Sequence, residues 1–151
     1  MEKLVSVFIF FTTFLSIIIT IAAKGCWTNG WAINVVNDID NNKAPIQVHC
    51  KSKDDDIGMK SLGFHQSVDW KFCEKVITPS TLYFCHFYMG NKEQVFDVFN
   101  DTHKSLCQET DKSKDYWACT WLVRPDGFYI VDRKDGGEKV VKIHDWKQGR
   151  V

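Results

Sequence analysis

Six cysteines are the side chains of this 151-residue sequence with the most distinctive chemistry. No two of them stand in the Cys-x2-Cys spacing that is typical of zinc sites. An even number of cysteines in a small extracellular domain predicts disulfide bonds, which form in an oxidising compartment, and the sequence alone leaves the pairing open. The disulfide candidates are Cys26, Cys50, Cys73, Cys85, Cys107 and Cys119.

Five histidines supply the other groups that could act in acid–base or nucleophilic catalysis, but no two are spaced to share one face of a helix. A Cys–His hydrolase would need a free thiolate, and disulfide formation is the better explanation for each cysteine. The sequence also lacks a Gly-x-Ser-x-Gly elbow and a Gly-rich phosphate loop. We therefore predict no catalytic residue and no cofactor. The alternative is a secreted hydrolase or a defence protein whose site is assembled only in space.

Clustered carboxylates suggest calcium as a possible ligand, because hard cations prefer several oxygen ligands. The run Asp54 to Asp56 is too short to supply them. The segment Asp38 to Asn42 begins like a calcium-binding loop, but Lys43 and His49 stand where that loop requires Gly and Glu. We predict no metal site, and instead a solvated, Asp-rich turn closed by Gly58.

The charges of the chain balance, with 19 Lys and Arg against 19 Asp and Glu. Nucleic-acid binding requires a clustered cationic surface. No such run of Lys and Arg is present, so nucleic acid is not an expected partner.

The N-terminus has the parts of a secretory signal peptide: Lys3, the apolar run Leu4 to Ile21, and small residues at Ala23 and Gly25, after either of which cleavage fits. The run is also just long enough for an uncleaved membrane anchor, which is the alternative. We expect a secreted, extracellular protein with no membrane contact after cleavage. The expected divisions are residues 1–23 as signal peptide and residues 24–151 as one domain.

Short runs of β-branched and aromatic residues fill the rest of the chain and are separated by Gly, Asn, Asp and Pro. Their alternation predicts strands with one buried face, and seven to eight strands at this spacing indicate an all-β, antiparallel β-sandwich held by disulfides. The run Thr81 to Tyr88 has apolar residues on both faces of the expected strand, which predicts a central strand that is covered on both faces. The other expected strands are Trp31–Asn37, Ile46–Cys50, Gln66–Phe72, Gln94–Phe99, Tyr116–Val123, Gly127–Val131 and Lys139–Ile143.

Tryptophans are numerous, and four of the six fall at inward-facing strand positions: Trp31, Trp70, Trp117 and Trp121. The other two, Trp27 and Trp146, lie outside the expected strands. They are either exposed anchors for a partner, where Trp is enriched, or caps packed against the ends of the sandwich.

Two connections and one modification site complete the candidate surface. The sequon Asn100-Asp101-Thr102 predicts N-glycosylation on an exposed loop after a strand. The polar segments Asp38–Pro45 and Phe99–Asp115 are the expected recognition loops.

The sequence resembles the plant self-incompatibility protein (S-protein homologue) family. The resemblance runs from about Ile33 to Tyr129, and its most specific part is the segment HCKSKDDDIG. The family-motif residues are His49, Cys50, Lys51, Ser52, Lys53, Asp54, Asp55, Asp56, Gly58, Trp70, Phe72, Trp121, Asp126 and Gly127.

The resemblance implies a secreted β-sandwich with two disulfides among Cys50, Cys85, Cys107 and Cys119, and it brings no catalytic residue. Cys26 and Cys73 lie outside these four positions, and we expect them to form a third bridge. The implied function is that of an extracellular signalling ligand in a plant, which binds a protein partner, a cell-surface receptor. We expect the protein to be a monomer.

Overall fold

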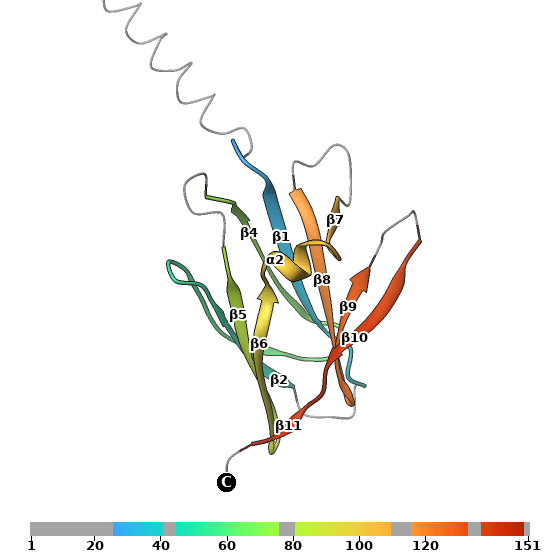
Figure 1. The fold of residues 1–151 in the computed structure, drawn as a ribbon. Helices are drawn as coiled ribbons and strands as arrows, with labels where there is room; N and C mark the ends of the chain where they lie inside the picture. Colours follow the sequence, from blue (N-terminus) through green and yellow to red (C-terminus); the bar gives the residue numbers. More distant parts are fainter. Residues whose placement is uncertain (1–25, 41–44, 76–80, 110–115, 133–136, 150–151) are drawn as a thin grey trace, which may run out of the picture.

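Alternating burial along the strands places one face of each of two β-sheets in a shared core (Figure 1). The computed structural model describes residues 26–40, 45–75, 81–109, 116–132 and 137–149. The predicted signal peptide, residues 1–23, lies outside this described part. The all-β, disulfide-bonded sandwich predicted from the sequence is confirmed.

The first sheet has the strand order β10-β9-β8-β1-β4, and the short strand β7 pairs with β8. All of its neighbouring strands are antiparallel except β1 and β8, which run parallel. Its strands are β1 (Gly30–Asn37), β4 (Ser67–Cys73), β7 (Gln108–Glu109), β8 (Tyr116–Arg124), β9 (Gly127–Asp132) and β10 (Lys139–His144).

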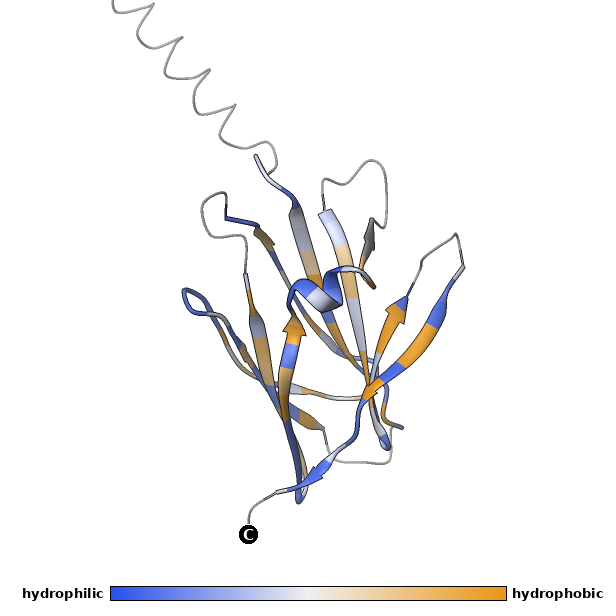
Figure 2. Ribbon diagram, viewed as in Figure 1, coloured by the Kyte–Doolittle hydropathy of each residue, from blue (hydrophilic) through white to orange (hydrophobic). Residues whose placement is uncertain are grey.

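The second sheet has the order β11-β6-β5-β2-β3 and is antiparallel throughout its described pairs. One short helix, α2 (Asp101–Lys104), follows β6. The strands are β2 (Ile46–Lys51), β3 (Asp56–Leu62), β5 (Tyr83–Met89), β6 (Lys92–Phe99) and β11 (Lys147–Gln148). Figure 2 shows hydrophilic residues at the β2–β3 and β5–β6 turns and a mixture of hydrophobic and hydrophilic residues along the strands.

Aromatic side chains join the two sheets. Trp121 on β8 is fully buried, and its indole Nε1 donates a hydrogen bond to the carbonyl of Val98 on β6 at 2.9 Å. Its ring lies 5.1 Å from that of Phe96, and Phe128 lies 4.8 Å from Phe87 across the same interface. This core is formed by residues from both sheets, so the fold depends on their facing each other.

Three disulfides are present, and no cysteine in the described part of the chain is free. Cys26 is joined to Cys73 at the end of β4 and ties the N-terminal segment to the first sheet. The other bridges are Cys50–Cys85, between the neighbouring strands β2 and β5, and Cys107–Cys119, which fixes the segment after α2 to β8.

Three strands were not predicted from the sequence: β3 and the two-residue strands β7 and β11. Asp56–Leu62 forms β3, although only Ile57 and Leu62 among its apolar residues point toward the core and Met59 is 53% exposed. An edge strand with one covered face and several polar residues gives little alternation. The predicted Asp-rich turn is therefore shorter than expected, and Gly58 lies inside a strand.

Two statements about burial were also wrong. Trp117 points to the same face as the buried Cys119 but is 39% exposed, because alternation determines the face of a residue and not the depth of cover at a strand end. In β5, Tyr83, Cys85 and Phe87 are buried, whereas the alternate residues are only half-buried. The strand is central, as predicted, but only its inner face is covered.

Candidate functional site

The segment that carries the most specific motif, residues 49–58, forms the β2–β3 hairpin. Ser52 closes the turn: its hydroxyl accepts hydrogen bonds from the backbone amides of Asp54 (3.3 Å) and Asp55 (3.0 Å), and its own amide donates to the Asp55 carbonyl at 2.8 Å. A Ser side chain that satisfies amides two and three residues further on is a standard way to build such a turn. Ser52 therefore has a structural role.

Asp56 fixes the start of β3. Its Oδ1 accepts from the Gly58 amide at 2.8 Å and lies 2.6 Å from Nε2 of His49 on β2. These two hydrogen bonds hold the pKa of the Asp56 carboxyl below its ordinary value. Gly58 has φ +78°, a left-handed conformation that favours glycine and that allows the bulge in this hairpin.

Asp55 connects the turn to the core. Its Oδ2 accepts from the hydroxyl of Tyr83 on β5 at 2.7 Å, and the Tyr83 ring packs on Trp70 and Phe72 of β4. Burial, followed by the bond to Asp55, raises the pKa of Tyr83 to about 12. The motif residues Trp70 and Phe72 thus support the hairpin through the Tyr83 ring.

The last carboxylate of the run, Asp54, is paired with Lys75, which holds its pKa below the ordinary value by hydrogen bonding and charge. All three carboxylates of the turn therefore have partners. Lys53 is exposed and makes no ion pair with any residue that the structure describes. Beside the turn is a hollow of about 500 Å³, lined by Ser52, Lys53, Asp54, Lys75, Thr81, Leu82 and Phe84.

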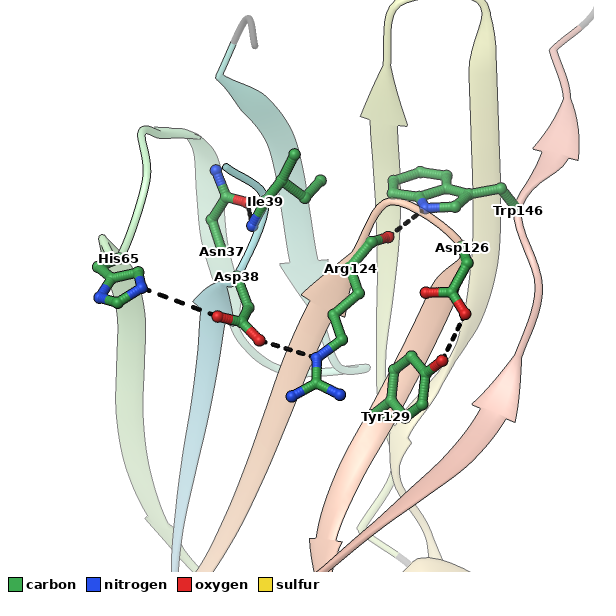
Figure 3. A network of polar contacts seen from close by, with 8 residues as sticks. All are labelled: Asn37, Asp38, Ile39, His65, Arg124, Asp126, Tyr129 and Trp146. Atoms are coloured by element: carbon green, nitrogen blue, oxygen red, sulfur yellow. Dashed lines mark hydrogen bonds and ion pairs between the residues drawn. The ribbon is translucent and has the colours of Figure 1, made fainter. Parts of the chain in front are cut away.

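A second polar cluster, which we call the arginine network, lies where β1 and β8 end (Figure 3). The Nε of Arg124 donates to Oδ2 of Asp38 at 2.8 Å, and Oδ1 of Asp38 lies 3.8 Å from Nε2 of His65. The guanidinium of Arg124 lies 4.8 Å from the centre of the Tyr129 ring. The backbone carbonyl of Arg124 accepts a hydrogen bond from the indole Nε1 of Trp146 at 2.8 Å. This cluster joins four separate segments of the chain.

The motif residues Asp126 and Gly127 belong to the same network. The carboxylate of Asp126 accepts from the hydroxyl of Tyr129 at 2.5 Å and pairs with Lys142 at 3.3 Å, and both lower the pKa of Asp126. Lys142 also pairs with Asp145 at 2.7 Å. At Gly127, with φ +154°, an added Cβ would lie 2.3 Å from the carbonyl oxygen of His144, so only glycine fits.

The expected recognition loops are partly built into the fold. Ile39 is buried, and its amide donates to Oδ1 of Asn37 at 3.0 Å, while Asp38 is held by Arg124 (Figure 3). In the second loop, Asn100 is half-buried and caps helix α2, accepting from the His103 amide at 2.9 Å. The sequon therefore lies at a helix start and not on the exposed loop that was expected, and its glycosylation stays a prediction.

The two tryptophans outside the expected strands differ. Trp146 packs on Phe128, with 4.5 Å between the ring centroids, and is part of the arginine network. Trp27 is 97% exposed and follows the bridged Cys26.

The histidines lie in separate places, as their spacing suggested. His49 is paired with Asp56, His65 with Asp38, and His86 with Glu93 at 3.1 Å. His103 and His144 are partly buried among aromatic rings. Over the described ranges, no group of three or more His, Cys, Asp or Glu side chains is placed to hold a metal ion.

Several residues of both clusters were not singled out from the sequence: Arg124, Tyr83, Lys75, Asp145 and Lys142. Tyr83 lies in the run Thr81 to Tyr88, two residues before Cys85. A tyrosine at an inward-facing strand position is the only feature of the sequence that could have indicated its role. The lysine–carboxylate pairs join residues that are up to 21 positions apart, so sequence spacing carries no information about them.

Comparison with known proteins identifies the chain. The family model of the plant self-incompatibility protein S1 matches residues 32–146. S-protein homolog 18 of Arabidopsis thaliana is 33% identical over 96 residues, which cover 63% of this chain and 65% of that protein. S-protein homolog 3 of the same plant is 31% identical over 120 residues, covering 80% of this chain and 75% of its own length.

The described residues contain no helix that is long and apolar enough to cross a membrane. The matched region includes both polar clusters and five of the six cysteines. The chain is a member of the plant self-incompatibility protein S1 family.

Proposed function

We propose that this protein is a secreted ligand that acts by binding a protein on the surface of a plant cell. The observation that carries the proposal is the way in which the potentially reactive groups are used. Each cysteine of the described chain is in a disulfide, and His49, His65 and His86 are each paired with a carboxylate in a different part of the sandwich. This arrangement favours a rigid binding module over a catalyst, which needs convergent groups.

The disulfides support the extracellular part of the proposal. Three bridges in a domain of this size are typical of secreted proteins, because cytosolic thiols are kept reduced. Membership of the family agrees with this compartment. Intact mass of the protein recovered from the medium of plant cells would show loss of about 23 residues, as expected for a signal peptide, and a gain of six hydrogens on reduction. A full-length chain with free thiols would contradict secretion.

Binding to the cell surface is tested with fluorescently labelled, oxidised protein on plant protoplasts. We expect saturable binding that unlabelled protein displaces and that brief protease treatment of the cells removes. Reduced and alkylated protein is the control, since it has the same sequence without the fold. Binding that does not saturate, or that survives protease treatment, would contradict a protein receptor.

A further inference from the structure

The outer face of the second sheet carries exposed apolar side chains. Strand register places Met59, His49, His86 and Val95 in one row across β3, β2, β5 and β6. Met59 is 53% exposed and Val95 is 48% exposed, at the two ends of the row. Exposed apolar groups that share one face are a common property of protein interaction surfaces.

The hollow beside the β2–β3 turn belongs to this face. Phe84 is opposite Lys51 on β2 and Asp97 on β6, so it points outward like His86 two residues later. Leu82, just before β5, is 42% exposed and lines the hollow with Phe84. The hollow thus combines an apolar wall with the polar turn.

The charged side chains that line the hollow are two ammonium groups, Lys53 and Lys75, and one carboxylate, Asp54. Asp54 pairs with Lys75, so the ammonium group of Lys53 is left without an ion pair within the described residues. Asp55 and Asp56 bond to Tyr83 and His49 and are not among the lining residues. The lining is therefore positive next to an apolar wall, which is complementary to an anionic group beside an apolar one.

We propose that this hollow, with the adjoining row Met59 to Val95, is the surface that binds the protein partner. The partner inserts an apolar side chain against Leu82 and Phe84 and places a neighbouring carboxylate at Lys53. This inference rests on the proposed function, because it specifies the surface that the receptor contacts. The proposed binding surface is thus on the outer face of the second sheet, and not in the two loops expected from the sequence.

The first experiment compares matched variants in the protoplast binding assay. Lys53→Glu and Leu82→Asp change the hollow, and Lys139→Glu and Val140→Asp make the same changes on β10, where Val140 is 38% exposed. We expect the hollow variants to bind about ten-fold or more weakly and the β10 variants to bind like the wild type. Unchanged disulfide mass and unfolding midpoint would show that each variant is folded.

The second experiment uses a probe that does not depend on the receptor. N-acetylated, C-amidated Gly-Leu-Asp-Gly is titrated into ¹⁵N-labelled protein, with Gly-Leu-Asn-Gly as the uncharged control. We expect shifts in the amide resonances of Lys53, Leu82 and Phe84 with the first peptide that are weaker with the second and absent in Lys53→Glu.

The outcomes separate the two proposals. If the wild type binds cells and the hollow variants bind equally well, the surface is wrong while the ligand function stands. If the wild type does not bind cells, the ligand function falls. A peptide that leaves the hollow resonances unmoved, or equal shifts from both peptides, would overturn the proposed chemistry of the hollow.

Discussion

Two polar clusters at different ends of the sandwich are built from the same kinds of residue but differ in how completely they are paired. In the arginine network, Arg124 lies between Asp38 and Tyr129, and Lys142 lies between Asp126 and Asp145. In the β2–β3 hairpin, the three aspartates are paired, but Lys53 is not paired with any described residue.

The difference indicates what each cluster contributes. The arginine network joins the ends of β1, β8, β9 and β10, and its charges are satisfied by each other, so it holds the chain segments together. The hairpin uses its carboxylates for the same purpose, and in the proposal above the remaining cation and the apolar wall contact the partner. The role of a charged side chain therefore depends on whether it is paired within the fold, and not on its residue type.

The largest effect is expected at the arginine network. Gly127→Ala places a methyl group 2.3 Å from the His144 carbonyl oxygen, so backbone must move. We expect a loss of about 3 to 5 kcal/mol in the free energy of unfolding, measured by urea denaturation. The matched control is Gly90→Ala, where φ is also positive but no atom lies within 4 Å, and where a loss of about 1 kcal/mol is expected. Equal losses would show that the close contact is not decisive.

The second largest loss of stability is expected when the Cys50–Cys85 disulfide, which joins β2 of the hairpin to β5, is removed. Replacing both Cys50 and Cys85 by Ala removes a bridge between residues 35 positions apart and should cost about 3 to 4 kcal/mol. The same change at Cys107 and Cys119, which are 12 positions apart, should cost roughly 1 kcal/mol less on chain-entropy grounds. Thermal unfolding of the two double variants measures the difference. A larger loss at Cys107–Cys119 would contradict this order.

A smaller effect is expected where the hairpin meets the core. Tyr83→Phe keeps the ring contacts with Trp70 and Phe72 and removes the hydrogen bond to Asp55. We expect a loss of about 1 to 2 kcal/mol. In the wild type, Tyr83 should contribute to the tyrosine absorbance only near pH 12, and the absorbance change at that pH should be smaller in Tyr83→Phe. The hydrogen bond to Asp126 also raises the pKa of Tyr129, so a part of the late change remains in the variant. An unchanged alkaline titration would contradict the burial of this hydroxyl.

The stability of the fold should also depend on pH through two histidines that lie outside both clusters, His103 and His144. Burial lowers the pKa of His103, which lies against Trp121, and of His144, which lies against Phe96. A lowered pKa in the folded state means that stability is complete above the unfolded value of about 6.5 and is lost as the pH falls below it. The urea midpoint should therefore decrease between pH 7.5 and pH 5.

The variant His103→Gln identifies the source of this decrease. Glutamine does not titrate, so the variant should show a weaker fall over the same pH range. The lowered pKa values of Asp54, Asp56 and Asp126 act in the same direction, but only at a lower pH, where carboxylates become protonated. A fall of the same size in wild type and variant would assign the effect to other groups.

The smallest change in stability is expected for Lys53→Glu. Because this side chain is exposed and has no ion pair within the described chain, the free energy of unfolding should change by less than about 0.5 kcal/mol. In contrast, Asp38→Lys in the loop predicted to bind a partner should destabilise the fold, because it removes the pair with Arg124. Urea denaturation of the two variants tests whether the roles of hairpin and network are assigned correctly.

The sequence by itself determined the class of fold, because alternation of apolar residues reports directly which face of a strand is buried. Eight of the nine longer strands and the central position of β5 follow from this pattern, and the family follows from the motif around Cys50. The edge strand β3 and the exposure of Trp117 could not be predicted from the alternation of apolar residues. At the edge of a sheet or the end of a strand, burial depends on how far the opposite sheet extends over it.

Only the tertiary structure decided which charges are used internally. In the sequence, residues 51–56 hold two lysines and three aspartates, and nothing distinguishes Lys53 from Lys51 or Asp54 from Asp55. Their partners are Lys75, just after β4, and Tyr83, the first residue of β5. Pairing depends on distances of a few ångströms between residues far apart in the chain, so the free cation and the hollow beside it exist only after the two sheets and their loops have come together.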